Sequence, residues 1–302
     1  MNLKNKIISL LSALFLLSSS VYSAEKLKVV ATTGMLADAV KNIVGDKLLV
    51  TGLMGQGVDP HLYKASPQDL RSLLAANLVI YNGLHLEGRM GEILEKLGEK
   101  KTVVGIGDTL PQALLREAPG FQGAHDPHIW FDVSIWAKGV EIILEAIIKL
   151  DQTNADHYRK NAQDFNVKLK SLHEFVITKI NSIPKEKRVL ITAHDAFGYF
   201  GRAYGVEVLG IQGVSTESEA SIMYVNKIVA EIVQRKIPAV FVESSVPKKT
   251  VEALLESAAS KGHILKVGGE LFSDAMGSAG TDEGTYIGMV KHNVNIIVEG
   301  LR

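Results

Sequence analysis

The amino-acid sequence predicts an α/β protein of two lobes, each with a parallel sheet flanked by helices, joined by one long linking helix. Short β-branched runs alternate with longer helical patterns in both halves of the chain, which is typical of βαβ units. One long polar stretch interrupts this alternation in the middle. A chain of 302 residues also suits two domains, at roughly 100 to 200 residues per domain.

The strands are predicted from short apolar runs that read as buried parallel strands. In the first half these runs are 27–32, 48–54, 78–82 and 102–106. In the second half they are 188–192, 207–211, 239–243 and 263–267, with helical patterns at 221–235 and 249–261 between them.

The stretch 154–182 is polar, contains no Gly or Pro, and is followed by Pro184. Its apolar and aromatic residues recur at three- and four-residue steps, which predicts one helix of about 28 residues, or roughly 42 Å. They are Tyr158, Phe165, Leu169, Leu172, Phe175, Val176 and Ile180. We therefore expect lobes at 24–153 and 184–302, with a linking helix at 154–183.

Residues 1–23 have the pattern of a secretory signal peptide, with Lys4 and Lys6 before an apolar run at 7–17 and small residues at the end. This run is too short for a membrane span, which needs about 20 residues. We expect export to the periplasm. Because there is no cysteine to lipidate, we also expect no lipid anchor.

Charge and composition exclude several classes of function. The chain has 33 basic and 33 acidic residues, so loss of Lys4 and Lys6 with the signal peptide leaves 31 against 33, a net charge of −2. This balance offers no electrostatic attraction to nucleic acid. The absence of cysteine excludes disulfides, thiolate zinc sites and cysteine nucleophiles. Histidine, carboxylate or carbonyl groups must hold any metal.

Four polar residues in loops after or near predicted strands are the candidate functional residues. His61 lies in a turn rich in Gly and Pro, and His128 follows Pro127 in a loop stiffened by that proline. His194 comes two residues after a predicted strand, and Asp274 follows the last one. In open α/β sheets, ligands bind beyond the carboxyl ends of strands. Common hydrolase, metalloprotease and nucleotide-binding motifs are absent from the sequence.

For two other residues, the sequence leaves two possible roles open. His125 is either a further ligand or a group beside the site, and Glu243 either orients a ligand imidazole or is a buried structural carboxylate. The remaining histidines are expected in loops, on the linking helix, or in packing and surface positions. They are His85, His157, His173, His263 and His292.

Four segments together resemble the metal-binding subunits of bacterial zinc and manganese ABC importers, the TroA-like group. The segments are 58–61 (VDPH), 126–130 (DPHIW), 192–199 (TAHDAFGY) and 271–277 (LFSDAMG). They occur in the family's order across nearly the whole mature chain. The resemblance implies that His61, His128, His194 and Asp274 ligate the metal, with two ligands from each lobe.

Three imidazoles and one carboxylate suit Zn²⁺ and tolerate Mn²⁺ or Fe²⁺, whereas Ca²⁺ and Mg²⁺ favour oxygen cages. Two features depart from the resemblance. Zinc-dedicated members commonly carry a histidine-rich loop, but segment 107–125 has only His125. Manganese-dedicated members often have glutamate where this chain has His194. The sequence therefore leaves the choice of zinc, manganese or iron open.

We expect a monomeric periplasmic solute-binding protein, and not an enzyme, that captures a divalent transition metal and delivers it to an inner-membrane ABC permease. One alternative is a secreted metal-dependent hydrolase, in which the metal keeps an open position for water. Another is an adhesin whose metal only fixes the fold. The expected ligand count of four argues against the first, and a folded ion-free form would argue against the second.

Overall fold

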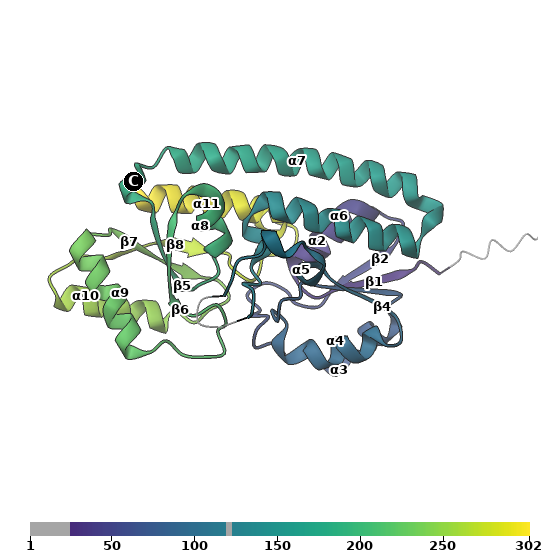
Figure 1. Ribbon diagram of the computed structural model, residues 1–302, viewed down its shortest axis with the longest axis horizontal. Coiled ribbons are helices and arrows are strands. Elements are labelled where there is room, and N and C mark those ends of the chain that lie inside the picture. Colours follow the sequence, from purple (N-terminus) through teal and green to yellow (C-terminus); the bar gives the residue numbers. More distant parts are fainter. Residues whose placement is uncertain (1–24, 119–122) are drawn as a thin grey trace, which may run out of the picture.

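A computed structural model describes residues 25–118 and 123–302. The predicted signal peptide lies outside the described residues. Two α/β lobes lie side by side, and one long helix runs along both of them (Figure 1). No helix in the described part of the chain is long and apolar enough to cross a membrane.

The first lobe contains a four-stranded parallel sheet in the order β2-β1-β3-β4. Its strands are β1 (Lys28–Ala31), β2 (Leu49–Gly52), β3 (Leu78–Tyr81) and β4 (Thr102–Gly105). Its helices are α2 (Gly34–Val44), α3 (Pro67–Ala75), α4 (Gly91–Gly98), α5 (Ile106–Thr109) and α6 (Val133–Leu150).

Alternate strand residues bury opposite faces of this sheet, as the two-residue period of a strand requires. Val29 and Ala31 join the core beneath α2 and α6, whereas Val30 joins a separate core with residues of α3 and α4. Figure 1 shows these two helix pairs on opposite sides of the sheet. The strands are thereby fixed in position, and so are the loops that leave their carboxyl ends.

The second lobe has two parallel strand pairs, β5 with β6 and β7 with β8, and β5 lies beside β7. The strands are β5 (Val189–His194), β6 (Glu207–Gln212), β7 (Ala239–Glu243) and β8 (Lys266–Leu271). The helices are α8 (Gly198–Tyr204), α9 (Ile222–Arg235), α10 (Lys249–Ser260) and α11 (Tyr286–Leu301). The predicted α/β class is confirmed.

Two strand predictions in this lobe were wrong in their bounds. Strand β5 continues to His194, so this histidine ends the strand and does not follow it. Strand β8 covers Lys266–Leu271 and not 263–267, because the glycines that read as a strand end lie inside it. A Cβ atom at Gly268 would lie 2.7 Å from the Phe241 ring, so only glycine fits this pairing.

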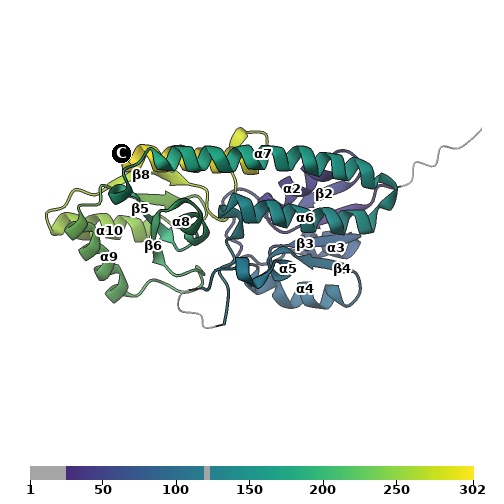
Figure 2. The same ribbon diagram turned by 45° about the horizontal axis from the view of Figure 1, so that its top comes forward.

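The long helix α7 (Ala155–Asn181) confirms the predicted linking helix. It packs against α2 and α6 of the first lobe and against α11 of the second. Figures 1 and 2 both show it spanning the two lobes. One continuous apolar core beneath it includes Leu169 of α7, Val40 of the first lobe and Val294 of the second. The two lobes are therefore joined by shared packing as well as by the chain.

Candidate metal centre

The four predicted ligands meet between the lobes. His61 lies in the loop after β2, and His128 lies in the loop before α6. His194 is the last residue of β5, and Asp274 comes three residues after β8. All four are buried, with exposed fractions between 0 and 3%. One ligand atom from each residue can be chosen so that all four lie within 4.8 Å of one another.

The spacing of these atoms matches a small metal-coordination shell. His128 Nε2 lies 3.4 Å from His194 Nε2 and 3.4 Å from Asp274 Oδ1. Asp274 Oδ2 lies 3.3 Å from His194 Nε2 and 3.7 Å from His61 Nε2. Four donors placed tetrahedrally at about 2.0–2.1 Å from an ion are about 3.4 Å apart. The cluster therefore has the dimensions of a zinc-sized site.

Three atoms in the cluster have no hydrogen-bond partner among the described residues, although they are buried. They are His61 Nε2 and both carboxylate oxygens of Asp274. Unpaired buried polar atoms are rare in native proteins and carry a large desolvation cost. A cation at the centre of the cluster would satisfy all three at once, so the residues present fit a bound metal ion.

His128 is oriented by its near neighbour Asp126. The Asp126 carboxylate accepts the backbone N–H of His128 at 3.0 Å and pairs with the ring Nδ1 at 2.7 Å. The second oxygen of Asp126 accepts a hydrogen bond from Arg116 at 2.7 Å. A hydrogen bond at Nδ1 fixes the ring so that Nε2 faces the cluster.

His194 is oriented in the same way by Glu243, the last residue of the neighbouring strand β7. One carboxylate oxygen accepts the backbone N–H of His194 at 2.9 Å, and the other pairs with its Nδ1 at 2.5 Å. The structure thus selects the orienting role for Glu243 from the two that the sequence left open.

His61 is held mainly through its backbone. Its N–H donates to Asp59 Oδ1 at 2.9 Å, and Asp59 Oδ2 accepts the hydroxyl of Thr216 from the other lobe at 2.6 Å. The loop ends at Ser66, which caps helix α3 and forms a reciprocal capping box with Asp69. No hydrogen bond to the His61 ring occurs within the described residues.

The loop that carries Asp274 is fixed from two sides. Trp130 Nε1 donates to the carbonyl of Ser273 at 3.1 Å. The side chain of Asn293 in α11 exchanges two hydrogen bonds with the backbone of Phe272, at 2.9 and 2.7 Å. The carboxylate is thus held in place by its backbone and not by direct partners.

The surroundings shift the pKa values of the three histidines in different directions. Burial lowers the pKa of His61 to about 3. Burial also acts to lower the pKa of His128, but Asp126 and Asp274 outweigh it and raise that pKa to about 9. Likewise Glu243 and Asp274 outweigh burial and hold the pKa of His194 well above its ordinary value. The Asp274 pKa is well below its ordinary value, because the His194 and His128 charges outweigh burial.

Without a metal, the centre therefore holds two protons on imidazoles. These two charges and the Arg116 guanidinium face four carboxylates, those of Asp126, Asp195, Glu243 and Asp274. Exchange of the two protons for one divalent ion leaves this balance unchanged. The exchange therefore adds no net charge to the buried centre, where an uncompensated ion would carry a large cost.

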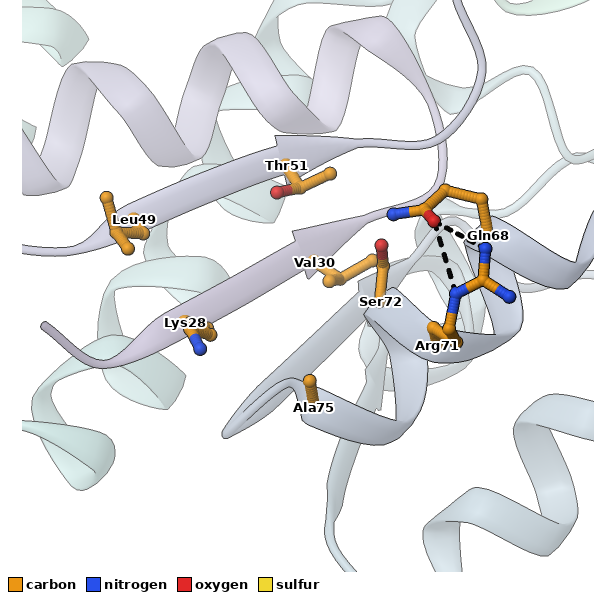
Figure 3. Close-up of a pocket in the computed structure, with 8 residues that line it drawn as sticks. All are labelled: Lys28, Val30, Leu49, Thr51, Gln68, Arg71, Ser72 and Ala75. Atoms are coloured by element: carbon orange, nitrogen blue, oxygen red, sulfur yellow. Dashed lines mark hydrogen bonds between the residues drawn. The ribbon is translucent and has the colours of Figure 1, made fainter. Parts of the chain in front are cut away.

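A separate hollow of about 330 Å³ lies over β1, β2 and α3 (Figure 3). Its lining includes Lys28 and Arg71, and Arg71 donates two hydrogen bonds to Gln68 at 2.7 and 3.2 Å. None of its lining residues is a histidine or a carboxylate. It therefore offers no anionic or imidazole ligand for a metal.

Residues 29–300 match the family described as zinc-uptake complex component A, periplasmic. The match covers almost the whole described chain. The chain belongs to this family. Membership makes the protein a component of a metal-uptake system and confirms the expected class, a solute-binding subunit and not an enzyme.

Individual relatives of the chain are named for different metals. It is 51% identical to the zinc-binding protein TroA of Treponema pallidum over 275 residues, which covers 90% of this chain and 88% of the relative. It is 46% identical to the manganese-binding lipoprotein MntA of Bacillus subtilis over 278 residues, 92% of this chain and 90% of the relative.

Two solved structures of similar proteins superpose on this chain over most of its length. The periplasmic zinc-binding protein TroA of Treponema pallidum superposes with a TM-score of 0.88 at 49% identity, covering 91% of this chain and 99% of its own. Fe(III)-bound YtgA of Chlamydia trachomatis superposes with a TM-score of 0.82 at 26% identity, covering 91% and 98%. The chain thus shares its fold with a zinc-binding protein and with a protein solved with Fe(III) bound.

The sequence analysis missed two residues of the centre, Asp126 and Arg116. The i, i+2 spacing of Asp126 and His128 was an available signal, since it lets one carboxylate bond both the backbone and the ring. Arg116 gave no local signal, because it meets its partners only in the folded chain. His125 does not join the four clustered residues.

Proposed function

We propose that this protein captures one divalent transition-metal ion, Zn²⁺ or Mn²⁺ and also Fe²⁺, on His61, His128, His194 and Asp274. It then delivers the ion to the permease of an ABC importer. The observation that carries the proposal is the set of unpaired buried atoms, His61 Nε2 and both oxygens of Asp274, facing two oriented imidazoles. These buried atoms carry a desolvation cost when they have no partner, and a bound cation would remove that cost.

The donor set favours zinc-like ions over calcium and magnesium. Three imidazole nitrogens suit borderline ions, and the two carboxylate oxygens of Asp274, which face different histidines, allow a fifth donor. Relatives named for zinc, manganese and Fe(III) support a site that accepts several ions.

The mature protein acts as a periplasmic monomer without a lipid anchor, with lobes at 24–153 and 184–302 and a linking helix at 154–183. The absence of cysteine supports the lack of an anchor, even though MntA and other relatives are named lipoproteins. The position of α7 supports these boundaries, because it lies between the two strand sets in the sequence and packs on helices of both lobes.

Calorimetric titration of the ion-free mature protein with Zn²⁺ and with Mn²⁺ tests the proposal. We expect one tight equivalent in the parent and its loss in Asp274→Ala. The matched control is Asp282→Ala, which removes an exposed carboxylate from the following turn and should leave binding unchanged. Equal binding by Asp274→Ala and the control would contradict the assignment.

Two further measurements on the same protein test the alternative functions, a metal-dependent hydrolase and an adhesin with a structural metal. A hydrolase needs an open metal position, so Mn²⁺-loaded protein would show a rapidly exchanging bound water by proton relaxation. A structural metal would be needed for folding, so the ion-free form would unfold without cooperativity. We expect neither result, because four residues donate to the ion and because the apolar core beneath α7 joins the two lobes without any metal contact.

A further inference from the structure

Arg116 of the first lobe contacts two carboxylates, each of which adjoins a metal ligand of a different lobe. Its Nη1 donates to Asp126 Oδ2 at 2.7 Å, and its Nη2 lies 3.8 Å from Asp195 Oδ2. Asp126 orients the ring of His128, and Asp195 directly follows His194 in the chain. The side chains of Arg116 and Asp195 are only 27% and 17% exposed, so solvent screens this pair less than a surface pair. One guanidinium thus connects the two ligand-bearing segments across the lobes.

The second lobe also holds Arg116 through its backbone. The hydroxyl of Tyr199 accepts the N–H of Arg116 at 3.0 Å and donates to the carbonyl of Asp126 at 2.9 Å. The N–H of Asp126 in turn donates to the carbonyl of Arg116 at 2.8 Å. Three residues after Tyr199, Arg202 donates to the carbonyl of Leu114 at 2.6 Å. These hydrogen bonds fix the position of Arg116 against helix α8 of the second lobe.

Gly198, the first residue of α8, leaves the space that the guanidinium fills. A Cβ atom at this position would overlap Nη1 and Cζ of Arg116. Gly198 is not among the glycines with a positive φ, so its backbone conformation is open to other residues. Alanine also suits a helix better than glycine does. An alanine here would therefore push the guanidinium away, because the end of a flexible side chain moves more easily than the helix.

We propose that Arg116 is a positioning residue that locks the lobes in their metal-bound arrangement, because it holds Asp126 and Asp195 at the same time, and that release of the ion requires the contact with Asp195 to open. This inference rests on the proposed function. The planar guanidinium presents several N–H donors in a fixed geometry, so it can hold two carboxylates in different directions.

The two contacts have separate roles. Asp126 lies in the same lobe as Arg116, so this pair stays intact when the lobes tilt, and it keeps the carboxylate in place to orient His128. Asp195 lies in the other lobe at 3.8 Å, so even a small tilt breaks its contact with the guanidinium. The first contact therefore supports ligand geometry, and the second resists separation of the lobes.

Three substitutions separate these roles. Arg116→Ala removes both contacts, Asp195→Asn weakens only the contact between the lobes, and Gly198→Ala displaces the guanidinium without removing a charge. The matched control is Arg89→Ala. Arg89 also forms an ion pair between the lobes, with Glu217 at 3.7 Å, but this pair does not include a carboxylate that orients a ligand. Stopped-flow mixing of the Zn²⁺-loaded protein with an excess of a chromophoric chelator measures the rate of release.

We expect Arg116→Ala and Gly198→Ala to release Zn²⁺ about tenfold faster than the parent. Asp195→Asn should release it about two- to fivefold faster, the effect of one partly exposed ion pair. Association rates should change by less than about twofold, since the contact forms after the ion has entered. The double variant Arg116→Ala/Asp195→Asn should release no faster than Arg116→Ala, because Asp195 has already lost its partner. The control should keep the parent rate.

The visible absorption of the Co²⁺-loaded protein gives a second readout, because it reports ligand geometry and not the stability of the fold. Arg116→Ala should change this spectrum, and Asp195→Asn should keep it. Arg116→Lys supplies one ammonium group, which can reach Asp126 but cannot hold both carboxylates. We expect it to keep the parent spectrum and to release Zn²⁺ as fast as Asp195→Asn does.

Release from Arg116→Ala and Gly198→Ala at the rate of the control would overturn the proposal. A double variant whose release is accelerated by the product of the two single factors would also overturn it, because Arg116 and Asp195 would then act independently. If Arg116→Ala does not fold, Gly198→Ala and Asp195→Asn decide the matter against the same control. Failure of the proposed function is a different result, because the parent would then bind no Zn²⁺ tightly and would show no release to measure.

Discussion

The carboxylate of Glu243 accepts both the backbone N–H and the ring Nδ1–H of His194, at 2.9 and 2.5 Å. One residue thus fixes the backbone, the tautomer and the ring orientation of a metal ligand from the end of the neighbouring strand. Because β5 and β7 pack side by side, the pairing depends on the sheet and not on a flexible loop.

We predict that Glu243→Gln weakens metal binding about 10- to 100-fold. The glutamine oxygen can still accept the backbone N–H, but its amide then donates to Nδ1 and moves the ring proton to Nε2. The measurement is competition with a chromophoric chelator. Glu270→Gln is the control, since Glu270 is half exposed and pairs with Lys248 at 2.9 Å. An unchanged Kd in Glu243→Gln would show that the orientation of His194 does not limit affinity.

The second prediction concerns the number of protons released when the metal binds. The pKa of His128 is raised to about 9 and that of His194 lies well above its ordinary value, so both rings are protonated at neutral pH without metal. Binding of Zn²⁺ at about pH 7.5 should therefore release about two protons. Calorimetry in buffers of different ionisation enthalpy measures this number directly.

The same pKa shifts set the pH window of affinity. Ordinary imidazoles with a pKa of about 6.5 would give an affinity that is flat above about pH 7 and falls below about pH 6. Here protons compete at higher pH, so affinity should continue to rise from pH 7 toward the His128 pKa of about 9. A plateau between pH 7 and pH 8.5 would contradict the raised pKa values.

A third prediction concerns selectivity at the third ligand. His194→Glu introduces a hard oxygen donor that favours Mn²⁺ relative to Zn²⁺. In this fold, however, it also removes the Nδ1–H that Glu243 accepts and places two carboxylates together. We expect His194→Glu to weaken both metals, and His194→Glu/Glu243→Gln to recover Mn²⁺ binding more than Zn²⁺ binding. Titration of both variants with each ion tests this, and equal recovery of the two metals would contradict it.

A fourth prediction concerns motion. The continuous core beneath α7 includes residues of both lobes, and Asp38 of α2 accepts the backbone N–H of Tyr286 in α11 at 3.1 Å. Wide opening would expose this core. We therefore expect the radius of gyration from solution scattering to change by less than about 1 Å on Zn²⁺ binding. A decrease of several ångströms would indicate a wide hinge motion.

Local patterns in the sequence were enough to predict most of the fold. The β-branched runs predicted strand β7 at its observed bounds, and the apolar spacing predicted α7. Strand β8 was misplaced because Gly268 reads as a strand end, whereas the ring of Phe241 on the neighbouring strand requires glycine there. The local sequence of one strand does not show which side chains of the neighbouring strand will pack against it.

The candidate ligands were predicted from sequence motifs, but most of the residues that position them were not. Nothing near Arg116 in the sequence indicates that it reaches Asp126 or that its guanidinium lies where a Cβ atom of Gly198 would fall. The raised pKa of His128 likewise depends on the carboxylates of Asp126 and Asp274, which outweigh the opposing effect of burial only where the folded chain brings them to the ring. Tertiary contacts set the electrostatics of the centre.

Anomalous diffraction from crystals of the Zn²⁺-loaded protein tests the central claim most directly. The account predicts one strong zinc peak per chain, about 2.0–2.2 Å from His61 Nε2, His128 Nε2, His194 Nε2 and at least one oxygen of Asp274. A main peak elsewhere, or a zinc ion bound by water in place of one of these residues, would contradict it.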